Sequence, residues 1–396
     1  MPFTGVSEVD LKREFVELFQ QEGANRSRLC DRYGVSRTLG YRTLDRFVAE
    51  GDEGLAPRSR RPRSCPNATP PEIEAAVLAV RAEHPAWGGR KIEAVLLRRG
   101  LASPRPSTIT QIIRRNGLAL GAFGGGQVHY KRFEHPEPND LWQMDFKGHV
   151  ALRSKARLHP LTVLDDHSRF NLVLAACGDE RTETVKAHLT QAFRRYGLPW
   201  RITADNGPPW GNGPRDRFTP LGVWLIDLGV AIGHSRPYHP QTQGKDERFH
   251  RSLKAEALSG PPFDDLDHAA RQLERWRDIY NTQRPHQALD MATPIERYRP
   301  SNRSFPETIP PVQYQDDEVE PRKVCSAGRF SFKCRIFKAP RAFRRRTIAL
   351  RPTMIDGVYD VIYRTTTIAS IDLRRPMDQT QPVTDVPEHL SPMSPV

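Results

Sequence analysis

The chain has 396 residues, of which 37% are hydrophobic, and a formal net charge of +13. It has no run of about 18 apolar residues, which excludes a membrane-spanning helix. Its five scattered cysteines form no CxxC pair, which excludes a disulfide scaffold and a cysteine-based zinc site. Residues 1–133 carry 22 basic and 14 acidic side chains, and residues 321–375 carry 14 and 3. Basic ends around a mildly acidic middle indicate two parts that bind a polyanion and a central part with another function. The alternative is that the positive charge is only a generic basic surface.

Residues 1–56 predict a helix-turn-helix. Apolar residues at helical spacing indicate a first helix around 11–19, followed by helices over 27–33 and 37–50. Gly34 suits the tight turn, and Ser36 is a good N-cap for the last helix. The residues expected to pack inward from this helix are Leu39, Leu44, Phe47 and Val48. The residues expected to reach DNA bases are Arg37, Thr38, Tyr41 and Arg42. An ordinary three-helix bundle is the alternative.

Residues 57–68 are rich in proline and arginine, which predicts an extended basic linker. Its candidate contacts to phosphates or a minor groove are Arg58, Arg60, Arg61 and Arg63. Residues 69–128 predict a second helix-turn-helix-like domain, with helices from about residue 69, over 90–99 and over 107–116. Arg114 and Arg115 on the last helix are further candidate DNA contacts.

Residues 129–300 predict an α/β domain with a mixed sheet. Strand-like segments at 141–148, 160–165 and 169–177 come first, and strands at 200–204 and 231–235 then alternate with helices. Two long helices over 243–258 and 264–282 close the domain. Residues 301–321 form a proline-rich linker, and five short strand-like segments within 322–375 predict a small basic β-barrel. Residues 376–396 are expected to be disordered.

Three carboxylates stand out in the α/β domain. Asp145 interrupts an apolar strand, Asp205 directly follows the strand 200–204, and Glu247 lies on the helix 243–258. A carboxylate in a buried strand is costly unless it is paired, protonated or bound to a metal. Three converging oxygen ligands suit Mg²⁺ or Mn²⁺. Taken alone, each acid could be a turn cap or a surface charge, and for Asp205, which precedes Asn206-Gly207, this alternative is equally good.

Helical phase selects Glu247 over Asp246 as the third acid. Glu247, His250, Arg251 and Lys254 follow one another at i, i+3, i+4 and i+7 and are expected to share one face. Asp246 lies instead toward the apolar side of the helix. Glu247 would then reach the metal, while His250, Arg251 and Lys254 would hold DNA nearby.

The surrounding motifs are highly specific as a set. Trp142-Gln143-Met144-Asp145, Asp205-Asn206-Gly207 and the run from His239 to Glu247, closed by Leu253-Lys254, resemble the integrase core of DDE transposases and retroviral integrases. Residues 280–286 with Pro294, and residues 84–92, are similar to segments of bacterial insertion-sequence transposases. The resemblance covers most of residues 10 to 300. Two departures are a longer interval between Asp205 and Glu247 and the lack of a His/Cys zinc module before the core.

The resemblance implies an RNase H-like core in which Asp145, Asp205 and Glu247 form a catalytic triad that holds two divalent ions, Mg²⁺ or Mn²⁺. We expect a transposase that binds the ends of its element, frees a 3′-OH by hydrolysis and transfers that hydroxyl to target DNA. Double-stranded DNA is the expected partner, and joining two ends requires a dimer or larger multimer. We expect no membrane partner and a cytoplasmic, nucleoid-associated location, because no secretory signal begins the chain.

Two other functions stay open. A DNA-binding regulator or domesticated transposase would keep the fold with an inactive core, although the intact triad argues against it. A metal-dependent nuclease of the same fold would cut DNA without joining it, so a joined product separates the two enzymes. The sequence contains no P-loop, GxGxxG or HExxH motif that would favour a nucleotide-cofactor enzyme or a zinc enzyme.

Overall fold

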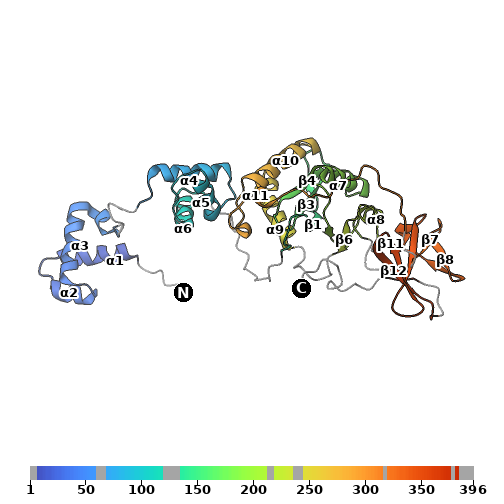
Figure 1. Cartoon of the computed structure of the whole chain (residues 1–396). Helices are drawn as coiled ribbons and strands as arrows, with labels where there is room; N and C mark the ends of the chain where they lie inside the picture. Colours follow the sequence, from blue (N-terminus) through green and yellow to red (C-terminus); the bar gives the residue numbers. More distant parts are fainter. Residues whose placement is uncertain are drawn as a thin grey trace. The chain divides into compact units, whose positions relative to one another are not determined.

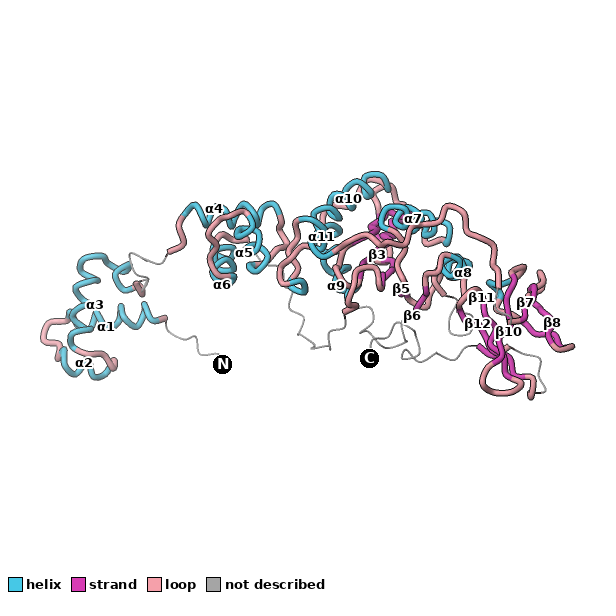
Figure 2. The backbone as a smooth tube through the Cα atoms, in the orientation of Figure 1, coloured by secondary structure: helices cyan, strands magenta, loops and turns pink. Residues whose placement is uncertain are grey.

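The computed structural model describes residues 7–58, 68–118, 134–211, 218–234, 244–314, 319–375 and 380–382 (Figures 1 and 2). The chain divides into two compact units, residues 1–68 and 69–396, and each is described by itself. Within the described residues, no helix is both long and apolar enough to cross a bilayer. Arg60, Arg61 and Arg63 of the expected linker lie outside the described residues, as does most of the tail for which disorder is expected.

The N-terminal unit contains the three expected helices, α1 (Glu8–Gln20), α2 (Arg26–Arg32) and α3 (Arg37–Glu50), followed by the 3-10 turn η1 (Gly51–Leu55). Ser36 caps α3 as predicted, because its side chain accepts the Leu39 N–H. The expectation that Leu39 and Val48 pack inward is wrong, since they are 49% and 70% exposed. Gly40 instead faces the core, where a Cβ atom would lie 3.0 Å from Cys30 Sγ and 3.1 Å from Phe15.

A second helical module consists of α4 (Pro71–Glu83), α5 (Gly89–Arg98) and α6 (Pro106–Arg115). Its core joins Trp87 to apolar residues of all three helices, including Val80, Ile92 and Ile109. Helices α5 and α6 approach closely at Gly89, because a Cβ there would lie 2.3 Å from the Pro106 carbonyl oxygen. The helix bounds match the sequence-based expectation to within one or two residues.

The central sheet contains β1 (Leu141–Phe146), β2 (Val150–Ala151), β3 (Arg157–Asp165), β4 (Asn171–Cys177), β5 (Arg201–Ala204) and β6 (Ala231–His234). β1 pairs antiparallel with β3, and β3 pairs antiparallel with β2 and β4. β1 also pairs parallel with β5, which pairs parallel with β6. The sheet is therefore mixed, as the meander followed by alternating strands and helices predicts.

Helices cover both faces of this sheet (Figure 1). Met144 and Val163 join the core under α7 (Thr182–Tyr196) and α8 (Pro220–Asp227), whereas Leu164 and Leu174 join the core under α9 (Gly244–Leu253) and α10 (Leu266–Thr282). Because successive strand side chains alternate between faces, Asp145 lies on the α9 side. The expected helix 243–258 is divided in two, since α9 passes into a π-helical turn, Lys254–Leu258. The short helix α11 (Pro294–Arg297) follows α10.

The C-terminal region contains β7 (Glu320–Lys323), β8 (Arg329–Phe332), β9 (Arg335–Lys338), β10 (Thr347–Pro352), β11 (Val358–Tyr363), β12 (Thr366–Asp372) and β13 (Gln381–Pro382). The expected barrel is not confirmed. Five strands form a sheet in the order β13-β12-β11-β10-β7, β8 and β9 form a separate hairpin, and the described strands do not close. Turn signals predict hairpins between successive strands, but they do not determine whether the first and last strands pair.

One carboxylate ties α8 to the C-terminal sheet. Asp227 at the end of α8 accepts hydrogen bonds from the Tyr363 hydroxyl at 2.6 Å, from Arg364 Nε at 2.9 Å and from an Arg346 guanidinium nitrogen at 2.6 Å. Burial raises the pKa of Asp227, but these three donors outweigh it, so the pKa lies below its ordinary value. The ionised form therefore stabilises the contact between α8 and the C-terminal sheet.

We expect Asp227→Asn to lower the free energy of unfolding at pH 7 by about 1–3 kcal/mol, because a charge-assisted acceptor is lost. A carboxyl whose pKa is lower in the folded state contributes stability above its unfolded pKa and loses it as pH falls through the folded pKa. The difference from the parent should therefore shrink below about pH 4 in urea unfolding at several pH values. Asp360→Asn, which breaks a more exposed pair with Arg351, is the control and should cost well under 1 kcal/mol. A pH-independent loss in Asp227→Asn would contradict this assignment.

Candidate active site

Asp145 and Asp205 come together on neighbouring parallel strands. The register pairs Leu141 with Arg201 and Gln143 with Thr203, and its continuation places Asp145 opposite Asp205, which directly follows β5. Burial raises the pKa of Asp145 to about 6, and the charge of Asp205 is the next cause. Burial also raises the pKa of Asp205. The two carboxyls therefore lie close enough to disfavour each other's ionisation.

Each carboxyl is held by the backbone beside it. Asp145 Oδ1 accepts the Phe146 N–H at 2.8 Å, and Asp205 Oδ1 accepts the Gly207 N–H at 3.1 Å. The Phe146 ring stacks on Trp210 with centroids 5.5 Å apart, which packs the end of β1 against the loop after Asp205. Among the described residues, no group donates a hydrogen bond to Oδ2 of either acid. This oxygen-only, half-buried pair fits a divalent cation, because a bound cation would relieve the cost of ionising both carboxyls.

His250 of α9 lies beside Asp145. Its Nε2 is 2.9 Å from the Thr162 hydroxyl, which donates its own proton to the Asp145 carbonyl at 2.9 Å. His250 Nδ1 lies 3.8 Å from Asp145 Oδ2. Burial, with the charge of Lys147, lowers the pKa of His250 to about 4, so the ring is neutral at pH 7.

The helical phase of α9 is only partly as expected. Glu247, Arg251 and Lys254 are exposed, but His250 is 8% exposed and does not share their face. His250 packs inward four residues after Asp246, since positions i and i+4 overlap on a helix. The expectation that His250 contacts DNA beside Glu247 is therefore not supported by its position.

On α9, Asp246 is the acid whose pKa is affected by the charge of Asp145. It is 2% exposed, as its place on the apolar side predicts, and its Oδ1 has no hydrogen-bond partner among the described residues. Burial holds the pKa of Asp246 well above its ordinary value, and the charges of Asp145 and Asp166 add to this effect. The sequence analysis missed this proximity, because it depends on how α9 packs against the sheet.

The structure does not bring Glu247 to the aspartate pair. No group of three or more His, Cys, Asp or Glu side chains within the described residues is arranged to hold a metal ion. Residues 235–243, which include most of the motif that precedes Glu247, lie outside the described residues. The role of Glu247 as a ligand thus stays a prediction.

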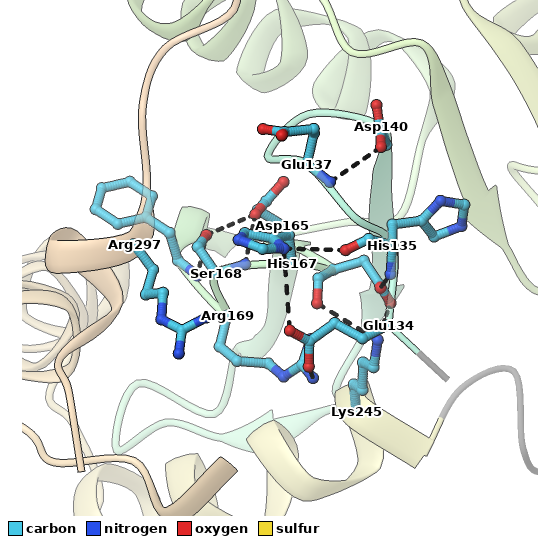
Figure 3. Close-up of polar contacts among 12 residues, drawn as sticks. Glu134, His135, Glu137, Asp140, Asp165, His167, Ser168, Arg169, Lys245 and Arg297 are labelled. Carbon is cyan, nitrogen blue, oxygen red and sulfur yellow. Dashed lines mark hydrogen bonds and ion pairs between the residues drawn. The ribbon is translucent and has the colours of Figure 1, made fainter. Parts of the chain in front are cut away.

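A polar network fixes the start of α9 (Figure 3). Lys245 Nζ lies 2.5 Å from Asp166 Oδ1, and Asp166 also accepts hydrogen bonds from Gln143 Nε2 at 2.7 Å and the His135 N–H at 2.9 Å. Burial lowers the pKa of Lys245 to about 8, and Asp166 opposes this shift. Neighbouring Asp165 accepts the Asn139 N–H at 2.7 Å. The network joins the segment before β1, the turn between β3 and β4, and the first turn of α9.

The predicted DNA contacts of the N-terminal unit lie at the surface. Arg37, Thr38, Tyr41 and Arg42 are all exposed at the start of α3. Arg37 Nε donates to Ser27 Oγ of α2 at 3.2 Å, and Tyr41 packs edge-on against Phe19. Arg58 pairs with Glu50. In the second module Arg114 is exposed, and Arg115 Nε donates to Glu74 at 3.0 Å.

Known protein families match most of this architecture. The family described as "Integrase core domain" matches residues 135–240, and a second family of the same description matches residues 228–294. A helix-turn-helix domain matches residues 11–63, and a homeodomain-like domain matches residues 40–113. The IS481 family transposase C-terminal domain matches residues 319–379.

The individual relatives are also insertion-element proteins and a retroviral polyprotein. The chain is 28% identical over 235 residues to the insertion element IS407 uncharacterized 31.7 kDa protein of Burkholderia multivorans, covering 57% of this chain and 82% of the relative. It is 26% identical over 274 residues to the insertion element IS476 uncharacterized 39.2 kDa protein of Xanthomonas euvesicatoria, covering 67% and 75%. It is 37% identical over 120 residues to the Gag-Pro-Pol polyprotein of mouse mammary tumor virus, covering 30% of this chain and 6% of the polyprotein.

Among solved structures, the HTLV-2 integrase catalytic core domain in complex with magnesium is similar at 17% identity and a TM-score of 0.31, covering 41% of this chain and 97% of that one. The α/β domain is thus an integrase core domain, and helix-turn-helix domains precede it. These matches support a likeness of the chain to insertion-sequence transposases with a retroviral-integrase-like core.

The coupling between the two aspartates can be measured directly. In metal-free protein the Asp145 carboxyl should titrate near pH 6. In Asp205→Asn its pKa should fall, because a like charge is lost, but should stay above 3.8, because burial is the larger cause. NMR titration of protein labelled at the aspartate carboxyl carbons reads out both values. Glu247→Gln, which changes an exposed acid, should leave the Asp145 titration unmoved, and an equal shift in both variants would contradict the pairing.

Proposed function

We propose that this protein is a transposase that binds the ends of its mobile element, hydrolyses a phosphodiester bond there and transfers the resulting 3′-OH to target DNA. The observation that carries the proposal is the pair formed by Asp145 and Asp205, whose carboxyls disfavour each other's ionisation at the edge of the integrase core. A pair of this kind suits chemistry that needs a bound cation. The helix-turn-helix matches supply the means of holding DNA.

Asp145, Asp205 and Glu247 are the residues that would hold two divalent ions, Mg²⁺ or Mn²⁺. Bound ions of this kind stabilise the attacking and leaving oxygens of an in-line displacement. For Glu247 to contribute, the first turn of α9 must adjust, since its carboxyl is exposed. Asp246 is buried on the neighbouring side of the helix.

The other residues hold the reacting groups in place. Neutral His250 lies beside Asp145, with its Nδ1 3.8 Å from Oδ2, and occupies this side of the site without adding charge. Arg251 and Lys254 are exposed on the Glu247 face, where they would contact phosphates. Two successive displacements would follow, in which water and then the freed 3′-OH is the nucleophile. No protein nucleophile is needed.

Recognition of the element ends falls to the exposed start of α3. Arg37, Thr38, Tyr41 and Arg42 have the placement of base-reading residues, and Arg114 and Arg58 would contact the DNA backbone. Since one active site acts on one end at a time, joining two ends requires at least two copies of the chain on the DNA.

A strand-transfer assay tests this function. Labelled duplexes that copy the DNA flanking the gene are mixed with supercoiled target and Mg²⁺ or Mn²⁺. Wild-type protein should give joined product only with metal, and Asp205→Asn should lower the rate by on the order of 10³-fold or more. Asp267→Asn, which changes an exposed acid of α10, is the matched control and should keep wild-type activity.

The assay separates the alternatives. Metal-dependent cleavage without joining would identify a nuclease of the same fold. Salt-sensitive binding without cleavage or joining, in both metals, would identify a DNA-binding regulator with an inactive core.

A further inference from the structure

Two sequence motifs that the active site does not use meet at one buried carboxylate. Glu256 lies in the π-helical turn that directly continues α9. From the segment after α10, Arg284 Nε donates to Glu256 Oε1 at 3.0 Å. From α5, Lys91 Nζ donates to the same oxygen at 3.4 Å, and from α10, Trp276 Nε1 donates to Oε2 at 3.3 Å. Residues 84–92 and 280–286 therefore converge on the helix that carries Glu247.

This cluster is buried and charged. The side chains of Glu256 and Arg284 are each 9% exposed, and that of Lys91 is 23% exposed. Burial raises the pKa of Glu256, but the charges of Arg284 and Lys91 outweigh it, so the pKa is lowered and the group stays ionised. Burial lowers the pKa of Lys91 to about 8, while Glu256 opposes the shift. Removing one partner of such a cluster is costly, because the others lose part of the charge that compensates them.

On one side, the cluster is continuous with the core of the α4–α6 module. Trp87 is part of that core, stacks on His84 with ring centroids 3.6 Å apart, and lies near enough to Glu256 to help lower the pKa of its carboxyl. The Lys91 ammonium lies 5.9 Å from the centre of the Trp87 ring. Ile279 of α10 packs against the same core. The module is thus docked on the integrase core through apolar contacts and one ionic contact.

On the other side, the cluster is continuous with the packing of α9. Arg284 also donates to Ser252 Oγ of α9 at 2.8 Å, and its guanidinium lies 5.4 Å from the centre of the Tyr280 ring. Tyr280 and Trp276 pack against Phe249 of α9. The residues that hold Glu256 therefore also hold the inner face of α9.

The helix is consequently anchored at both ends. Lys245 and Asp166 hold its first turn, and Glu256 holds its far end, nine residues or about 13 Å beyond Glu247. We propose that Glu256, with Lys91 and Arg284, is a positioning site through which docking of the α4–α6 module sets the placement of α9, and hence of Glu247, for strand transfer. This inference rests on the proposed function for its consequence, but the mechanical coupling stands on the contacts alone.

Lys91→Met in the full-length chain tests the coupling, because methionine keeps the apolar stem of the side chain over Trp87 and removes the charge. Amide hydrogens of α9 and the π-helical turn should exchange roughly tenfold faster without DNA or metal. In the strand-transfer assay the rate at saturating DNA should fall roughly tenfold, while the half-saturating DNA concentration stays unchanged. Lys91→Arg can still pair with Glu256, so this variant should show the wild-type amide exchange of α9 and the wild-type strand-transfer rate.

Arg98→Met is the matched control. Arg98 also lies on α5 and also reaches the integrase core, but its partners at 2.8–3.1 Å are the Met291 carbonyl and Glu296 of α11. This pair is more exposed and makes no contact with α9. The exchange of α9 and the transfer rate should therefore stay at the wild-type values.

Three outcomes would overturn the proposal. Wild-type exchange of α9 in Lys91→Met would show that the charge does not hold the helix. Equally accelerated amide exchange of α9 in Arg98→Met would show that any weakening of the contact between the α4–α6 module and the integrase core loosens α9, whether or not Glu256 is involved. Equal loss of protection throughout α4 and α6 would assign Lys91 to the stability of its own module. A wild-type chain without joining activity would instead overturn the proposed function and leave the exchange comparison as the test of the coupling.

Discussion

Parallel pairing of β1 with β5 brings Asp145 and Asp205 out at the same edge of the sheet, where both carboxyls lose part of their hydration. On the other face of β1, Trp142 and Met144 pack under α7 and α8. The burial of these apolar side chains offsets the free-energy cost of dehydrating the carboxyls. Because the strand alternates, the same register that buries Met144 turns Asp145 toward α9. The rest of the integrase core serves to hold this pair in place.

Helix α9 is the second element on which the site depends, and it is fixed by buried charge at each end. Lys245 joins it to the turn between β3 and β4, and Glu256 joins it to Arg284 and to the α4–α6 module. Such pairs contribute little net stability compared with apolar packing, but they define one position of the helix. This position sets where Glu247, the proposed third ligand, lies on the helix.

A buried carboxylate also links the C-terminal region to the core. Asp227 at the end of α8 accepts hydrogen bonds from three side chains of the C-terminal sheet. The α4–α6 module and the basic C-terminal sheet are thus each attached to the integrase core through a buried carboxylate. Polar attachment of this kind restricts the orientation of a domain more than apolar contact alone, because hydrogen bonds are directional.

The sequence by itself determined the helix-turn-helix pattern and the mixed sheet, and it singled out three candidate acids, because capping residues, hydrophobic periodicity and specific motifs are local signals. Only the tertiary structure decided that the described strands of the C-terminal sheet do not close, that His250 packs beside Asp145 and that the buried carboxyl of Asp246 lies near Asp145. It also brought Lys91, Glu256 and Arg284 together. These features depend on strand closure, on the rotation of α9 and on contacts between residues up to 165 positions apart, none of which a local pattern encodes.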